Sequence, residues 1–282
     1  MTQNLRGTRP RTADQLAELA PGTTPRVRPN LLVGLAVVVV YAALIAIDDV
    51  LPGSGDGDIT DPTLAFLRTH VLPLSIIAVL LVIFVRWSGW GPAVWRESPQ
   101  RRIPRWWLAF PVLYVVVVAG GLSTADWSAA PSFLLVSLVG MLLVGFTEEL
   151  GLRGILLTGA RGSVPEIAAL LISAVVFGSL HFLNLLHGAA AGATTFQVAG
   201  AAGFGVVFYA LRRATGLLWP AMLLHGLNDF ALQIQPVTNG ETPDAPVWAV
   251  ATNSLIIVLS VALVVSVLRE SLRQRSGAAA TA

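Results

Sequence analysis

Two adjacent glutamates inside an apolar run are the residues of this sequence best suited to chemistry. Glu148 and Glu149 are followed by Arg153 and by further leucine and isoleucine residues. A charged side chain at the centre of a bilayer costs about 2.5–3.5 kcal/mol on insertion scales, so charges kept there generally serve a function. Glu149 and Arg153 are four residues apart and share a helix face, whereas Glu148 points about 100° away. One carboxylate can therefore pair with the arginine while the other stays free as a general base.

Helical spacing also places a histidine, a phenylalanine and an amide on one face of another apolar run. Phe177, His181 and Asn184 follow the i, i+4, i+7 spacing of a helix face. Taken alone, His181 is more typical of a hydrogen-bonded core histidine than of a functional one. In that face Asn184 could fix the orientation of the imidazole ring.

A third apolar run carries an ionisable pair, which packing alone does not explain. His225 and Asp229 share a face, and Asn228 lies beside Asp229. Imidazoles can hold a water molecule, bind a metal or stabilise an oxyanion. Together with the two glutamates, these residues form an acid–base set, and we expect them to meet in one cavity.

A zinc site formed by Glu148, His181 and His225 is one alternative for this set, because zinc in hydrolases often has histidine and carboxylate ligands and an open water position. We favour a water-activating site without tightly held metal, since pairing with Arg153 neutralises the second carboxylate. The sequence contains no H-E-x-x-H motif, no G-x-S-x-G motif and no cysteine. Zincin, serine-hydrolase and cysteine-nucleophile chemistry are therefore not indicated.

Long apolar runs recur along the whole chain and must position these residues. Of the 282 residues, 55% are hydrophobic and only 12% are charged, against about 25% charged residues in a soluble protein. The pattern predicts an all-α polytopic membrane protein, a bundle of about eight transmembrane helices. The runs cover about residues 30–48, 64–85, 106–122, 133–158, 164–185, 196–211, 217–234 and 247–268. The predicted surroundings are the lipid bilayer, and a net charge of +2 does not suggest nucleic acid.

The distribution of charge predicts the orientation of this bundle. All 18 basic residues are arginine, and they gather in the terminal tails and in the loops on the same side of an eight-helix count. Acidic residues gather in the loops on the opposite side. Arg68 is the exception to the pattern, because it is an arginine on that opposite side. By the positive-inside rule, both termini are expected to be cytoplasmic.

The three patterns, taken in order, resemble the CPBP family of intramembrane proteases. This family contains type II CAAX prenyl proteases and bacteriocin-processing enzymes, and is also called Abi. The motifs that carry the resemblance are Glu148-Glu149-x-x-x-Arg153, Phe177-x-x-x-His181 and His225-x-x-x-Asp229. The resemblance implies a hydrolase, either glutamate-dependent or metal-dependent, with a catalytic cavity in the cytoplasmic half of a helical bundle.

The resemblance also implies a role for each motif residue. Glu148 and His181 would activate a water molecule, with Glu149 and Arg153 as a supporting ion pair. His225 and the residue four positions later would stabilise the oxyanion. The family usually has asparagine at that later position, whereas this chain has Asp229, so the amide of Asn228 could take the role instead. For a protein of the bacterial cell membrane, the substrate implied is a leader peptide or another membrane-associated peptide or protein, not necessarily a prenylated CAAX end.

The chain divides into four predicted parts. They are an Arg- and Pro-rich cytoplasmic tail (1–29), variable transmembrane helices (30–131), the catalytic core (132–234) and a last transmembrane helix with a cytoplasmic tail (235–282). Two other functions stay open. One is a proton-coupled transporter, since membrane carboxylates and histidines also form proton relays, although no inverted repeat is visible. The other is a non-catalytic immunity or scaffold protein with the same fold.

Overall fold

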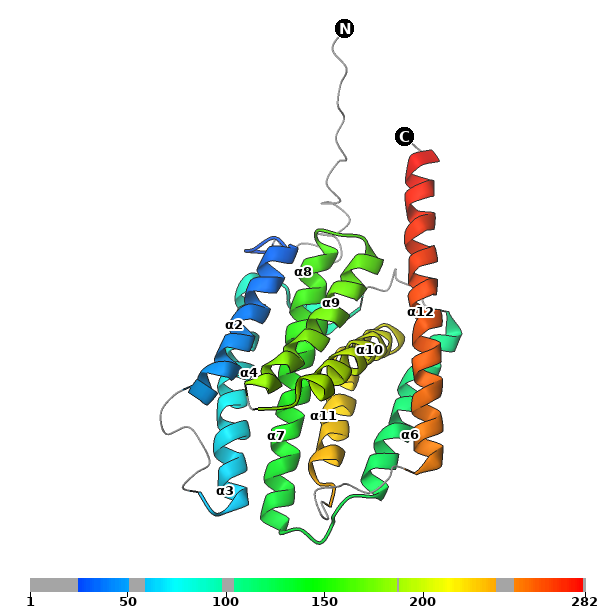
Figure 1. Ribbon diagram of the computed structural model, residues 1–282. Coiled ribbons are helices and arrows are strands. Elements are labelled where there is room, and N and C mark those ends of the chain that lie inside the picture. The colour runs from blue at the N-terminus through cyan, green and yellow to red at the C-terminus, as the bar shows by residue number, and fades with distance from the viewer. Residues whose placement is uncertain (1–24, 51–58, 98–103, 187, 237–245, 281–282) are drawn as a thin grey trace.

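The chain forms a helical bundle in the computed structural model (Figure 1). The structure describes residues 25–50, 59–97, 104–186, 188–236 and 246–280. Within these ranges every regular element is helical, apart from an isolated antiparallel bridge between Arg96 and Leu217. The all-α prediction is confirmed. Most of the predicted cytoplasmic tail lies outside the described residues, as do several loop charges used to predict the orientation.

Each of the eight predicted apolar runs corresponds to a helix or to consecutive helical segments. The elements are α2 (Leu31–Val50), α3 (Pro62–Phe66), η2 (Leu67–Val71), α4 (Leu72–Ser88), α5 (Gly91–Trp95), η3 (Arg105–Leu108), α6 (Ala109–Ser123), α7 (Pro131–Glu149), η4 (Leu150–Leu156), α8 (Leu157–Arg161), α9 (Glu166–Leu180), η5 (His181–Leu185), α10 (Ala191–Thr215), α11 (Trp219–Gln233) and α12 (Val247–Ala280).

Among the described residues, six helical stretches are long and apolar enough to cross a membrane. They are Pro62–Ser88, Trp106–Ser123, Pro131–Arg161, Glu166–Leu185, Ala191–Thr215 and Val250–Arg273. The apolar part of α2, Leu31–Ala46, is shorter, and α11 has 15 residues. α12 continues to Ala280, well past the predicted end near residue 268. The polar segment that follows the apolar run is therefore helical as well.

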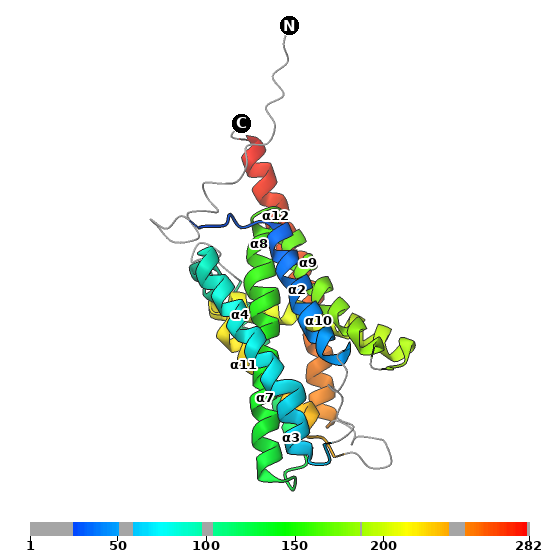
Figure 2. The same ribbon diagram turned by 90° about the vertical axis from the view of Figure 1, so that its left-hand side faces the viewer.

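The bundle has two distinct ends. α2 begins, α8 meets α9, and α12 terminates at the same end, which is the upper end in Figure 1. The connection between α6 and α7 lies at the opposite end. The connection between α9 and α10 projects sideways from the bundle (Figure 2). α8 ends at Arg161, so this arginine lies at the upper end of the bundle.

A pair of glycines lets α7 and α11 approach closely. A Cβ atom added to Gly145 would lie 2.5 Å from the amide nitrogen of Gly226. A Cβ atom added to Gly226 would lie 2.7 Å from the Cα atom of Leu142. Small residues allow this kind of backbone contact between membrane helices. The contact brings the helix that carries both glutamates against the helix that carries His225.

Replacing Gly226 with alanine should therefore destabilise the protein. The added methyl group would contact backbone atoms that cannot move independently, and such overpacking typically costs about 1–3 kcal/mol. The measurement is thermal unfolding of the purified protein in one detergent. Gly203→Ala is the control, since a Cβ atom at Gly203 meets nothing within 4 Å. Equal midpoints for the two variants would show that α7 and α11 do not pack this closely.

Candidate active site

The helix that carries the two glutamates changes pitch immediately after them. α7 ends at Glu149, and the following π-helical turn η4 runs to Leu156, with all seven residues buried. Two carbonyls in this turn accept side-chain hydrogen bonds. The Ser173 hydroxyl donates to the Leu152 carbonyl at 3.1 Å, and the Arg212 guanidinium donates to the Arg153 carbonyl. The structure thus differs from the regular helix predicted for this run, and π-helical turns of this kind are frequent at functional sites.

Glu149 is completely buried and contacts two partners through one oxygen. Its Oε1 atom lies 3.2 Å from Nη1 of Arg153 and 3.0 Å from Nδ1 of His225. The side chains of Glu149 and Arg153 are both 0% exposed. The ion pair that the four-residue spacing predicts is present, and it also holds the imidazole that comes from α11.

The second ring nitrogen of His225 faces two other carboxylates. Its Nε2 atom lies 3.3 Å from Oδ2 of Asp229 and 3.9 Å from Oε2 of Glu148. The latter distance is longer than a hydrogen bond. The Glu148 side chain is 19% exposed, whereas that of Glu149 is fully buried. The two adjacent glutamates therefore occupy different environments, with Glu148 the less constrained of the two.

The two ring nitrogens of His225 contact different carboxylates. Glu149 contacts Nδ1, and Asp229 lies on the Nε2 side together with Glu148. The side-chain amide of Asn228 donates to Oδ1 of Asp229 at 3.4 Å. Asp229 thus lies on the Nε2 side of the ring, and Asn228 contacts the other oxygen of the Asp229 carboxylate.

Two phenylalanines form an aromatic layer against which the charged groups rest. The Arg153 guanidinium carbon lies 4.0 Å from the ring centroid of Phe177 and 5.1 Å from that of Phe208. The Phe208 ring stacks on the His225 ring, with a centroid distance of 4.5 Å. Cation–π contacts of this kind strengthen when water is excluded. Phe177 belonged to a predicted motif, but no sequence signal indicated Phe208, which comes from α10.

His181 joins the group through Phe177. The two rings meet edge-on with centroids 5.5 Å apart, and the Phe177 ring lies 5.7 Å from that of His225. The Nδ1 atom of His181 lies 3.3 Å from the Phe177 carbonyl oxygen. α9 ends at Leu180, and a 3₁₀ turn begins at His181, so the helix face expected to include Asn184 does not continue.

The predicted orienting role of Asn184 is therefore wrong. Its side-chain amide donates to Oε1 of Gln197 on α10 at 2.9 Å. The Phe177 carbonyl, and not Asn184, contacts the His181 ring. The remaining predicted residues come from α7, η4, the junction of α9 with η5, and α11, and the contacts given above link them.

The arrangement of these donors does not fit a bound metal. Among the described residues, no group of three or more histidine, cysteine, aspartate or glutamate side chains could hold a metal ion. Both nitrogens of His225 already face carboxylate oxygens at 3.0 and 3.3 Å. In the zinc site considered for Glu148, His181 and His225, neither nitrogen of His225 is therefore free to bind the metal. The proposed reaction uses the side chains alone.

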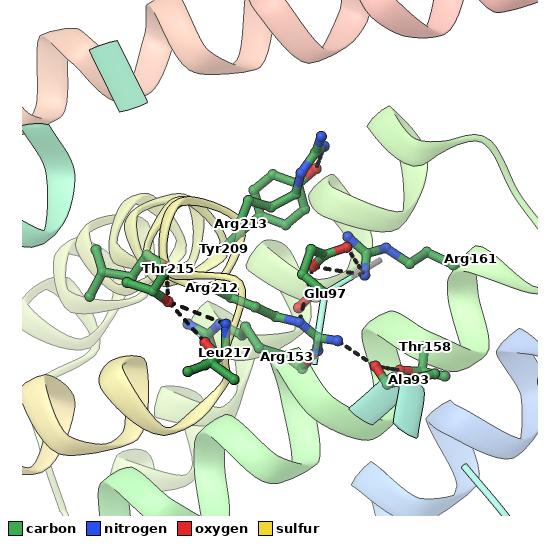
Figure 3. Close-up of polar contacts among 12 residues, drawn as sticks. Ala93, Glu97, Arg153, Thr158, Arg161, Tyr209, Arg212, Arg213, Thr215 and Leu217 are labelled. Atoms are coloured by element: carbon green, nitrogen blue, oxygen red, sulfur yellow. Dashed lines mark hydrogen bonds and ion pairs between the residues drawn. The ribbon is translucent and has the colours of Figure 1, made fainter. Parts of the chain in front are cut away.

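A second group of buried charges lies beside the site (Figure 3). Arg212 of α10 is fully buried, and its Nε atom lies 3.2 Å from Oε2 of Glu97, which follows α5. The same guanidinium donates to the carbonyls of Arg153 and Ala93. Arg161 also contacts Glu97, at 3.1 Å. Arg212 thus connects the segment after α4 to the turn that contains Arg153.

The same group of charges extends to α9. Arg161 lies 2.7 Å from Oε1 of Glu166, which also accepts a hydrogen bond from the Tyr209 hydroxyl at 2.7 Å. Arg213 donates to that hydroxyl at 2.7 Å. In the sequence these arginines indicate only the orientation of the bundle. Their burial could not be foreseen, because their partners are distant in the sequence.

Residues 130–231 match the family model described as type II CAAX prenyl endopeptidase Rce1-like. The predicted resemblance to this protease family is confirmed over these residues. The matched segment contains the residues of all three motifs, from Glu148 to Asp229. No curated protein and no solved structure matches the chain. At the level of the family, the match supports a membrane-embedded endopeptidase.

Removing the Arg153 side chain should destabilise the protein strongly. Arg153→Ala would leave the buried Glu149 carboxylate without its cation, and breaking a buried pair costs about 3–5 kcal/mol. The measurement is the free energy of unfolding by denaturant titration in mixed micelles. Arg86→Ala is the matched control, because Arg86 is exposed at the end of α4. A loss no greater than that of the control would show that the pair is not buried.

Proposed function

We propose that this chain is an intramembrane endopeptidase that hydrolyses a peptide bond with a water molecule activated by Glu148. The observation that carries the proposal is the unequal environment of the two glutamates. Glu149 contacts both Arg153 and His225, whereas Glu148 lies beyond hydrogen-bond distance of His225 and keeps some exposure. A general base needs this freedom, because it must reach both the water molecule and, later, the leaving group.

In the proposed reaction, Glu148 takes a proton from the attacking water, and the oxygen forms a bond to the carbonyl carbon of the scissile peptide. Negative charge then develops on the carbonyl oxygen. The peptide C–N bond breaks, and the protonated Glu148 returns its proton to the amine that leaves. His181 helps to hold the water molecule, consistent with its position against the Phe177 ring beside His225.

Groups on the Nε2 side of His225 stabilise the developing oxyanion in this proposal. In this proposal His225 is doubly protonated, so that Nδ1–H donates to Glu149 and Nε2–H is a donor toward the space near Glu148 and Asp229. An ionised carboxylate cannot donate a hydrogen bond. We therefore assign the amide of Asn228 as the second donor, with Asp229 positioning that amide through the 3.4 Å contact. Removing one donor to an oxyanion typically costs about 10²–10³ in turnover.

The proposed substrate is a membrane-associated or leader peptide, reached from within the bilayer of a bacterial cell membrane. Both termini are proposed to be cytoplasmic, on the basis of the arginine distribution. The proposed catalytic core is residues 132–234. It includes all residues assigned here to the reaction.

Glu148→Gln should abolish cleavage, because the amide keeps the shape of the side chain but cannot accept the proton. General acid–base groups contribute typically about 10²–10⁴ to the rate. Peptides are compared by mass spectrometry in membranes from cells that carry the intact protein or the variant, and any candidate substrate is then tested with purified protein.

The control for this experiment is Asp61→Asn. Asp61 is exposed and caps α3 by accepting from the Thr63 amide at 2.8 Å, a role that asparagine also fills. The control should cleave normally. Cleavage by Glu148→Gln at the parent rate would contradict the assignment of the base.

Cleavage should also be independent of zinc. Neither the ring nitrogens of His225 nor the fully buried Glu149 offers a free ligand position. We expect purified protein to contain zinc well below one equivalent and to retain activity after chelator treatment. Metal analysis and a chelation assay on the same preparation measure this. Stoichiometric zinc, with activity lost on chelation and restored by zinc, would make Glu148, His181 and His225 metal ligands after all.

A further inference from the structure

A hollow lies between the start of α6 and the C-terminal helix, away from the candidate active site. α6 and α12 pack side by side (Figure 1). The hollow has a volume of about 780 Å³, and residues from the η3 segment and from α12 line it. The lining residues are Pro104, Trp106, Ala262, Val265, Ser266, Arg269, Glu270 and Arg273.

The upper part of the hollow carries positive charge. Arg269 and Arg273 are both exposed and lie one helical turn apart on α12. The acidic residue of the lining, Glu270, lies 3.8 Å from the guanidinium of Arg213, whose side chain is only 1% exposed. Arg213 therefore offsets part of the glutamate charge from the interior of the protein. The charged residues of the lining, two arginines and one glutamate, leave it with one net positive charge.

The lower part of the hollow is apolar and continuous with a lipid-facing surface. Val265 and Ala262 lie about one and two turns below Arg269, and Val265 is 40% exposed. The same helix exposes Val258 and Val261, at 65% and 64%. These residues belong to the stretch Val250–Arg273 that is apolar enough to cross a membrane.

The lining of the hollow also contains a tryptophan. Trp106 is 37% exposed and lines the hollow from the η3 side. Tryptophan is enriched at the level of the lipid headgroups, where its ring is amphipathic. Basic pockets between transmembrane helices on the cytoplasmic side bind the headgroups of anionic lipids.

We propose that this hollow binds an anionic phospholipid. Arg269 and Arg273 hold the phosphate group through charge-assisted hydrogen bonds, and an acyl chain lies along Ala262 and Val265. A soluble phosphate ion would satisfy the arginines but leave the apolar part of the hollow uncovered. The continuity of charged and apolar lining selects a lipid. The proposal does not depend on the peptidase activity.

The test uses the full-length protein and native mass spectrometry. The protein is incubated with vesicles of phosphatidylglycerol or of phosphatidylcholine, extracted in mild detergent and analysed for retained lipid. We expect the parent protein to retain phosphatidylglycerol in preference to phosphatidylcholine. The double variant R269Q/R273Q should retain at least about tenfold less, because it removes both groups that form charge-assisted hydrogen bonds to the phosphate.

The control is R86Q/R96Q, which removes two exposed arginines that do not line the hollow. It should lower retention less than about twofold, since general attraction to anionic lipid is the smaller effect here. Equal losses in the two double variants would overturn the proposal. So would equal retention of the two lipids by the parent protein.

Two further experiments test the contact with the acyl chain and the identity of the bound anion. Ala262→Trp fills the apolar part while both arginines remain, so it should also abolish selective retention, and it covers the case in which R269Q/R273Q folds poorly. Undiminished retention by Ala262→Trp would contradict the proposed seat of the acyl chain. Displacement of phosphatidylglycerol by millimolar inorganic phosphate would assign the hollow to a soluble anion and overturn the lipid assignment.

Discussion

The carboxylate of Glu149 is completely removed from water, and the elements around it supply what that burial requires. A buried charge is tolerated only when it is paired and hydrogen-bonded. Arg153, one turn later, supplies the cation, and His225 supplies a donor from another helix. The guanidinium in turn lies against the rings of Phe177 and Phe208. A single desolvated carboxylate thus ties together α7, α9, α10 and α11.

This constraint separates two residues of identical chemistry. Glu148 and Glu149 are neighbours, so helix geometry turns them to different directions. Glu149 is held by the pair and the imidazole, while Glu148 remains beside Nε2 of His225 at 3.9 Å. Two carboxylates whose environments differ in this way can divide structural and acid–base roles between them. The close contact of Gly145 with Gly226 makes the division possible, because it brings His225 within reach of both.

Local patterns in the sequence predicted the helices and part of the site, whereas contacts between distant segments could not be predicted. Apolar runs identify membrane helices because a bilayer requires their length and composition. The four-residue spacing of Glu149 and Arg153 likewise predicted their ion pair. No local pattern indicated that Phe208 would stack on His225 or that Arg212 would meet Glu97, since each depends on how helices cross. The predicted direction of Asn184 failed because the helix tightens to a 3₁₀ turn at His181.

The division between the two glutamates is tested most directly by the thermal unfolding of Glu148→Gln and Glu149→Gln, measured side by side in one detergent. Glu149→Gln leaves Arg153 as a buried cation without a counter-ion, so we expect a clearly lower midpoint, in keeping with the cost of about 3–5 kcal/mol for breaking a buried pair. Glu148→Gln removes a charge that no close ion pair requires, and its midpoint should equal that of the parent protein. Equal shifts in the two variants, or a larger shift for Glu148→Gln, would contradict the assignment of Glu149 as the structural carboxylate and Glu148 as the free one.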